Sequence, residues 1–311
     1  MEGSGFLMPH WHSCRSTAAY SQEETIMERF ENLVLDEERA LYGLNGAEVV
    51  RCTFEGPADG ESALKECRDV HLDDCDLRLR YPLWHVTGGS LHNCRMTDTC
   101  RAALWYDEDL TIRDCEMNGI KALRECRNIT VCGGSAISTE FGWMCRGLRV
   151  KDFTLTSEYP FLHTTDSEFD GFTLHGKYSF QYTRNLTFRN CVLDTKDAFW
   201  HAENITVYDS VVKGEYLAWY STNLRLVRCR IIGTQPLCYC KGLVLEDCTM
   251  EGCDLSFENS EVQATVNGRI DSVKNPVSGA ITADAIGEII LDEHKWPGEC
   301  PITCREQNSI A

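Results

Sequence analysis

Tryptophan, tyrosine and histidine recur at intervals of about 19 residues through the middle of the chain, in two adjacent series. Aromatic rings can cover the flat faces of sugar rings, while histidine and charged side chains hydrogen-bond the hydroxyl groups, so this mixture suits an extended, sugar-like ligand. We call both series together the aromatic strip. Its candidate ligand-binding residues are Trp84, Trp105, Trp143, Trp200 and Trp219, and also His85, Tyr106, His163, Tyr182, His201, Tyr220 and Tyr239.

A few charged residues in and beside the strip could transfer protons. Lys121 and Arg124 lie close together in sequence, and Asp197 shortly precedes His201. A cationic base next to an anionic sugar would suit a polysaccharide lyase, and paired carboxylates would suit a hydrolase. Ordinary surface charge explains the same residues more simply, so all four are weak catalytic candidates.

The sequence predicts no metal and no cofactor. A calcium-loop spacing of aspartates is absent, as are a nucleophile elbow and a phosphate-binding glycine loop. The pairs His10/His12 and Cys300/Cys304 could arise from composition alone, and we do not assign zinc to them.

The strip is part of a repeat of about 19 residues, which is clearest between Glu203–Ser221 and Thr222–Cys240. Numbered from zero, repeat positions 2 and 4 are apolar, position 6 is mostly Asp or Asn, and positions 9 and 15 are apolar. Alternation of period two indicates a strand with one buried face, and Asp and Asn favour turns. Two longer intervals are expected, one from Asn45 to Arg68 and one from Thr87 to Glu108.

Three short apolar segments for each turn predict an all-β fold, a single-stranded right-handed parallel β-helix of about 13–14 coils. A leucine-rich repeat needs 20–29 residues and a further leucine, and a hexapeptide helix needs multiples of six, so neither fits a unit of 19. The domain is expected to cover residues 26–292. Residues 1–25 are expected to be a disordered extension, and residues 293–311 a cap or tail.

The 18 cysteines fall mainly at two positions of the repeat, where Phe, Ser, Thr or Ala stand in other units. Positions that accept such residues require a buried group rather than a bond, so we expect free structural thiols in a reducing compartment.

Charge and hydropathy exclude several classes of partner. A net charge of −18 opposes binding to nucleic acid, and no apolar run is long enough to span a membrane. The first residues lack the features of a secretion signal, so we expect a cytoplasmic protein.

Several strings within the repeat resemble a known family. They are Arg-Tyr-Pro-Leu-Trp-His (80–85), Cys-Arg-Ala-Ala-Leu-Trp-Tyr (100–106), Gly-Ile-Lys-Ala-Leu-Arg-Glu-Cys (119–126), Lys-Tyr-Ser-Phe-Gln-Tyr (177–182), Thr-Lys-Asp-Ala-Phe-Trp-His (195–201) and Gly-Thr-Gln-Pro-Leu-Cys-Tyr-Cys (233–240). From about Met27 to Asp292 the chain is similar to an uncharacterised bacterial family, domain of unknown function 3737. The resemblance implies a pectate-lyase-like right-handed β-helix and no established activity.

Three interpretations of function stay open at this point. The first is a binding protein whose aromatic strip holds an extended, carbohydrate-like ligand. The second is a structural or protein-binding solenoid without a small ligand, because exposed Trp, Tyr and Arg also dominate protein interfaces. The third is a polysaccharide lyase or hydrolase.

Overall fold

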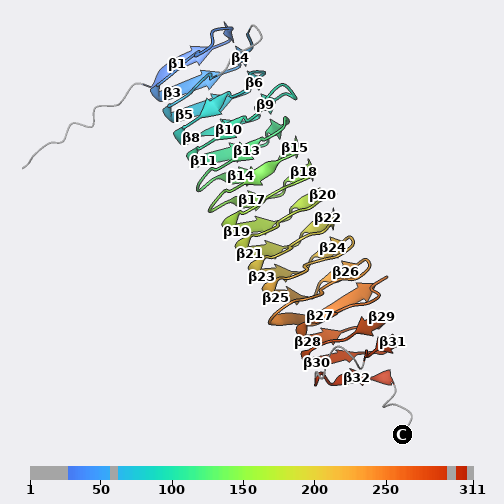
Figure 1. Cartoon of the computed structure of the whole chain (residues 1–311). Helices are drawn as coiled ribbons and strands as arrows, with labels where there is room; N and C mark the ends of the chain where they lie inside the picture. The colour runs from blue at the N-terminus through green and yellow to red at the C-terminus, as the bar shows by residue number, and fades with distance from the viewer. Residues whose placement is uncertain (1–26, 57–61, 293–298, 307–311) are drawn as a thin grey trace, which may run out of the picture.

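The computed structural model describes residues 27–56, 62–292 and 299–306, and these residues form one elongated stack of parallel β-strands (Figure 1). The described residues contain no α-helix, and the stack has about 14 turns with a spacing near 19 residues. The predicted parallel β-helix is therefore confirmed. The predicted extension 1–25 lies outside the described residues, as do residues 293–298 and 307–311 of the predicted cap.

The first face of the stack contains the longer strand of most coils. Its strands, in spatial order, are β1 (Glu28–Glu31), β3 (Asn45–Val50), β5 (Arg68–Asp73), β8 (Thr87–His92), β11 (Glu108–Arg113), β14 (Thr130–Cys132), β17 (Arg149–Lys151), β19 (Thr165–Asp170), β21 (Arg184–Arg189), β23 (Glu203–Tyr208), β25 (Thr222–Val227), β27 (Leu243–Glu251), β28 (Glu261–Val266), β30 (Ser278–Ala283) and β32 (Ile302–Cys304).

The second face contains shorter strands and joins the first through β27. They are β2 (Val34–Leu35), β4 (Thr53–Phe54), β6 (Asp76–Leu77), β9 (Arg95–Met96), β12 (Glu116–Met117), β15 (Ser135–Ile137), β18 (Thr154–Ser157), β20 (Thr173–Lys177), β22 (Val192–Lys196), β24 (Val211–Lys213) and β26 (Arg230–Ile232). Near the C-terminal end, β29 (Arg269–Lys274) and β31 (Ala285–Ile290) pair with each other.

The pairing register follows the predicted intervals. Asn45 pairs with Arg68 across the first longer interval, and Thr87 pairs with Glu108 across the second. Along the central coils the spacing is regular, and Arg184 pairs with Glu203, for which the sequence separation is 19. Because most coils repeat the same register, a residue type at one repeat position forms a column along the rod.

Within the described ranges, the third apolar segment is a strand in four coils: β7 (Leu83–Trp84), β10 (Leu104–Trp105), β13 (Leu123–Arg124) and β16 (Phe141–Trp143). In the following coils the same segment turns sharply, with Phe161, Phe180 and Phe199 at φ +61°, +56° and +60°. A left-handed conformation costs a bulky residue about 1–2 kcal/mol. Hydrogen bonds between coils offset this cost, since the amide of Phe180 donates to Pro160 O at 2.9 Å.

The core runs the whole length of the stack and is built from the inward columns. Phenylalanine rings stack through its centre, with the centroids of Phe161 and Phe180 4.9 Å apart and those of Phe180 and Phe199 5.2 Å apart. The 17 cysteines of the described residues are free, and 14 of them are buried. Buried thiols donate to the carbonyls of the preceding coil, as Cys229 does to Val207 O at 3.3 Å, which agrees with the expected structural role of the cysteines.

Candidate ligand-binding groove

Repeat position 17 forms a continuous stack of outward-facing rings, which we call the ring ladder: His163, Tyr182, His201, Tyr220 and Tyr239. Successive centroids lie 5.2, 5.0, 5.0 and 4.8 Å apart, close to the distance between neighbouring strands. His85 and Tyr106 form a shorter ladder of the same kind, with centroids 4.9 Å apart. The sequence-predicted residues of this position are thus brought together in two blocks.

The backbone explains why these rings point outward in a row. His163, Tyr182 and His201 have φ values of +56°, +55° and +54°. In this left-handed turn the amide of Tyr182 donates to Trp200 O in the next coil at 2.9 Å, and the amide of His201 donates to Trp219 O at 3.0 Å. The same bond in every coil sets the same side-chain direction, which produces the stack.

A hollow lies beside each block, between the rings and the first residues of the following strands. The hollow beside the ring ladder has a volume of about 360 Å³ and is lined by His163, Tyr182, His201 and Tyr220 with Thr183, Arg184, Glu203 and Thr222. The hollow beside the shorter ladder has about 290 Å³ and is lined by His85, Tyr106 and Glu125 with Thr87, Glu108 and Arg127. These volumes lie at the lower end of those of small-molecule sites.

The tryptophans of the strip, at repeat position 16, are half-buried rather than open to solvent. Trp84 stacks on Trp105 and Trp200 on Trp219, each with centroids 5.5 Å apart. The Nε1–H of Trp200 donates to Tyr216 O at 2.7 Å, and that of Trp219 donates to Gln235 O at 2.8 Å. Trp143 makes the corresponding bond to Tyr159 O. These contacts hold neighbouring coils together, and they leave the tryptophans less accessible than the sequence suggested.

Cations interrupt the tryptophan column instead of pointing into solvent. Lys65 Nζ lies 4.6 Å from the Trp84 ring centroid, and the Arg124 guanidinium lies 5.7 Å from Trp105 and 5.2 Å from Trp143. Arg124 is thus intercalated between two tryptophans, where cation–π attraction is worth about 0.5–2 kcal/mol.

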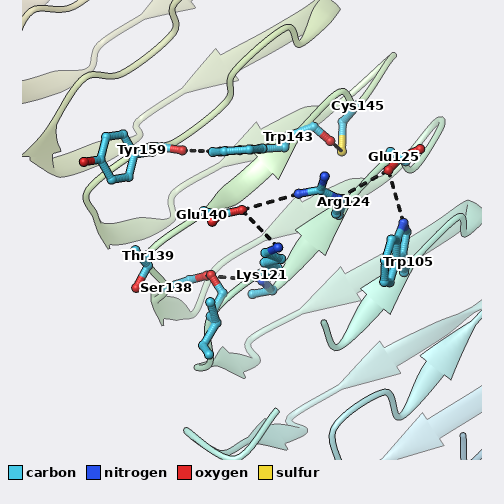
Figure 2. A network of polar contacts seen from close by, with 12 residues as sticks. Trp105, Lys121, Arg124, Glu125, Ser138, Thr139, Glu140, Trp143, Cys145 and Tyr159 are labelled. Atoms are coloured by element: carbon cyan, nitrogen blue, oxygen red, sulfur yellow. Dashed lines mark hydrogen bonds and ion pairs between the residues drawn. The ribbon is translucent and has the colours of Figure 1, made fainter. Parts of the chain in front are cut away.

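The catalytic candidates Lys121 and Arg124 belong to one polar network (Figure 2). Glu140 Oε2 lies 3.6 Å from Lys121 Nζ and 3.4 Å from Arg124, and Glu125 Oε1 lies 3.3 Å from Arg124 Nε. Trp105 Nε1–H also donates to Glu125 Oε1 at 3.3 Å. Two cations and two carboxylates balance each other, so the network joins three coils without leaving a free base.

The other two catalytic candidates occupy different surroundings. Asp197 is 5% exposed, and burial raises the pKa of its carboxyl, an effect that neighbouring Lys196 opposes. His201 is exposed within the ring ladder, between Tyr182 and Tyr220. The described residues contain no group of three or more His, Cys, Asp or Glu arranged to hold a metal ion.

Repeat position 0 supplies the polar wall of both hollows and was not among the predicted site residues: Thr87, Glu108, Arg127, Arg184, Glu203 and Thr222. Within this wall, Arg184 Nε lies 2.8 Å from Glu203 Oε2. The spacing of the sequence could have identified these residues, because only one buried residue separates the ring at position 17 from position 0 of the next repeat unit.

Comparisons with known proteins give one family model and distant structural likenesses. A family model described as "Protein of unknown function (DUF3737)" matches residues 28–303, and no curated protein matches the chain. Similar solved structures include the catalytic domain of a GH87 alpha-1,3-glucanase in complex with tetrasaccharides, at 10% identity and a TM-score of 0.35 over 89% of this chain and 63% of that one. Another is QnrB1, a plasmid-mediated fluoroquinolone resistance protein, at 11% identity and a TM-score of 0.18 over 76% of this chain and 90% of that one. This chain spans less than two thirds of the glucanase domain. Neither likeness carries an argument about this chain.

No helix in the described ranges is long and apolar enough to cross a membrane.

Proposed function

The chain belongs to the family of proteins of unknown function DUF3737, and we propose that it is a binding protein whose ring ladder holds an extended carbohydrate. One observation carries the proposal: the 360 Å³ hollow combines four exposed rings with hydroxyl and charged groups of the adjoining strands. Aromatic side chains with a few polar groups are the usual lining of a small-ligand site.

The stacking of the ladder determines how a ligand would be held. Inside the ladder each ring face is covered by the ring of the next coil, with interplanar angles of 6° and 7° at His201. The ligand therefore meets ring edges, tyrosine hydroxyls and histidine nitrogens, and a similar set recurs in every coil at about 4.8 Å. A chain of hydroxyl-bearing units running along the rod can hydrogen-bond to each set in turn.

The test is a binding titration with neutral and acidic oligosaccharides, on wild type and on the double variant Tyr182→Ala/Tyr220→Ala. We expect a sugar that binds the wild type to bind this variant at least tenfold more weakly, because two contacts of about 1 kcal/mol each are removed. Tyr159→Ala/Tyr178→Ala is the matched control, since these rings also stack, at 5.2 Å, but do not line the hollow. Equal loss in both double variants, or no binding of any sugar to the wild type, would refute the proposal.

A structural or protein-binding role is the second candidate, and the tryptophan column favours it. Bonds from Trp Nε1–H to the next coil and the intercalated Arg124 show that aromatic groups also hold the stack together. Under this candidate Tyr182→Ala/Tyr220→Ala lowers the melting temperature and has no effect on sugars. A polysaccharide lyase or hydrolase stays a prediction of the sequence alone.

We also place the protein in a reducing compartment, with the cytoplasm as the proposed location. The support is the burial of 14 thiols that pack as apolar side chains.

A further inference from the structure

A second hollow lies on the outer surface of the first sheet, away from the aromatic strip. It has a volume of about 350 Å³ and is lined by side chains of β11, β14, β17, β19 and β21, among them Arg113, Arg149, Lys151 and Arg189. Two carboxylates, Glu168 and Asp170, also line it. Four cations and two carboxylates leave a local charge of +2 in a chain whose net charge is −18.

The alternation of long and short side chains produces this hollow. At repeat position 5, neighbouring strands carry Arg113, Cys132 and Lys151. Neighbouring strands are about 4.8 Å apart, so the short Cys132 leaves a gap of about 10 Å between two long cations. At repeat position 3, the short Thr130 lies between the short Thr111 and the long Arg149. The floor of the gap therefore offers a hydroxyl and a thiol, and its rim is cationic.

Three of the four cations differ from most others on this face because they have no partner, whereas the Arg189 guanidinium lies 4.5 Å from the Tyr208 ring centroid. Elsewhere a cation pairs with a carboxylate of a neighbouring coil, as Arg184 does with Glu203 at 2.8 Å and Arg228 with Asp209 at 2.7 Å. Within the described residues, the side chains of Arg113, Arg149 and Lys151 make no hydrogen bond, ion pair or cation–π contact. Three unpaired cations around one hollow leave a positive field that an anion would neutralise.

We propose that this hollow binds a tetrahedral dianion, the phosphate or sulfate group of a small ligand, between Arg113, Arg149 and Lys151. The local charge of +2 matches a dianion, and arginine binds phosphate with paired, charge-assisted hydrogen bonds. Thr130 adds a hydroxyl donor. The remaining volume, above β19, accommodates the organic part of the ligand, and this site is independent of the carbohydrate groove.

The experiment is a titration of the full chain with sodium phosphate, sodium sulfate and sodium chloride at matched ionic strength, and with glucose 6-phosphate against glucose. We expect the dianions to bind and to raise the melting temperature above that in chloride. Arg149→Gln should weaken phosphate binding at least tenfold, because it removes a charge-assisted bond, whereas Glu168→Gln should strengthen it by removing a like charge. Tighter binding of glucose 6-phosphate than of phosphate would support a phosphate ester as ligand, and equal binding of phosphate and sulfate would support any tetrahedral dianion.

Lys241→Gln is the matched control, because it removes one positive charge from an exposed residue that does not line the hollow. Equal weakening by Arg149→Gln and Lys241→Gln would show a net-charge effect and overturn the proposal, as would the absence of any binding beyond chloride. Cys132 provides an independent readout: phosphate should slow its carboxymethylation by iodoacetate, measured on peptides, without slowing that of Cys300. Equal slowing at both thiols would likewise count against the site.

Discussion

Asp107 is a fully buried carboxyl whose environment predicts a pH dependence of stability. It is 0% exposed, its Oδ1 accepts from the amide of Val86 at 2.8 Å, and its Oδ2 has no hydrogen-bond partner. Burial raises the pKa of this carboxyl well above its usual value, although the bond from Val86 acts in the opposite direction. The folded protein therefore holds a proton on Asp107 at pH values where the unfolded chain has lost it.

The sign of the pH dependence follows from this difference in protonation. The folded state binds more protons than the unfolded state, so the free energy of unfolding falls as pH rises from the unfolded pKa of about 3.9 towards the raised folded pKa. Each pH unit in that window removes about 1.4 kcal/mol. The contribution of Asp107 therefore worsens steadily between the unfolded pKa and the raised folded pKa, and it stays constant above the folded pKa.

Asp107→Asn isolates this effect, because asparagine has the same shape, keeps an acceptor for Val86 and never ionises. Its buried amide group costs an amount that does not depend on pH, so the slope and not the absolute value is diagnostic. We expect the stability of Asp107→Asn relative to wild type to increase by up to about 1.4 kcal/mol per pH unit as pH rises above the unfolded pKa of about 3.9, measured by urea denaturation. Hydrogen exchange of the amides of β8 and β11 would report the same trend locally, which is useful if the long stack does not unfold in a single step. A difference in stability that does not change with pH would show that Asp107 ionises normally and would refute the reasoning.

Three further predictions test the stack itself. In the native protein a thiol reagent should modify only Cys132, Cys300, Cys304 and at most Cys14, which lies outside the described residues. After unfolding in guanidinium, all 18 cysteines should react. The buried thiols are also less ionised, because burial raises the pKa of Cys240 to about 11 and of Cys253 to about 12. Rapid native titration of most thiols would contradict the packing. His163→Gly should be more stable than His163→Ala by about 1 kcal/mol, because φ is +56° there and glycine avoids the left-handed penalty; equal melting temperatures would argue against the turn. Leu193→Asp should unfold the protein because the side chain is 0% exposed, whereas Val192→Asp on the same strand, at 42% exposure, should melt close to wild type.

The repeat made the fold predictable, because the same residue preference at each repeat position can be read from many units of one chain. Positions 2 and 4 alternate with outward residues in each coil, and the two insertions shift the register by the lengths counted from Asn45 and Thr87. Columns of cysteine next to serine and threonine indicated buried thiols. The sequence alone did not identify Asp107 as a buried carboxyl. Asp107 stands between Val86 and Cys126 in a column of small buried groups, and its place in that column could have indicated its burial.

The candidate site was predictable in composition and much less in geometry. The sequence placed the rings in columns but did not show which surface of a ring would be free. That depends on the spacing between coils, which is short enough for rings at position 17 to cover one another. The position of Arg124 between Trp105 and Trp143 has the same origin. The cationic hollow depends on which outward side chains remain unpaired, a property of side-chain conformation that no residue pattern states.

Strand β21 connects the two proposed sites, because its first residue lines the carbohydrate groove and its last lines the cationic hollow. Arg184 and Arg189 stand at the two ends of this extended strand, which corresponds to about 17 Å. An extended ligand lying along the rod meets the ring ladder alone, whereas one lying across the sheet meets the ladder and the cations. Phosphate therefore distinguishes the two orientations: it should compete with an acidic oligosaccharide that lies across β21 and have no effect on one that follows the ladder. Because the ladder repeats its groups every coil and the cations occur in one block, we favour the orientation along the rod, with the hollow serving a separate small ligand.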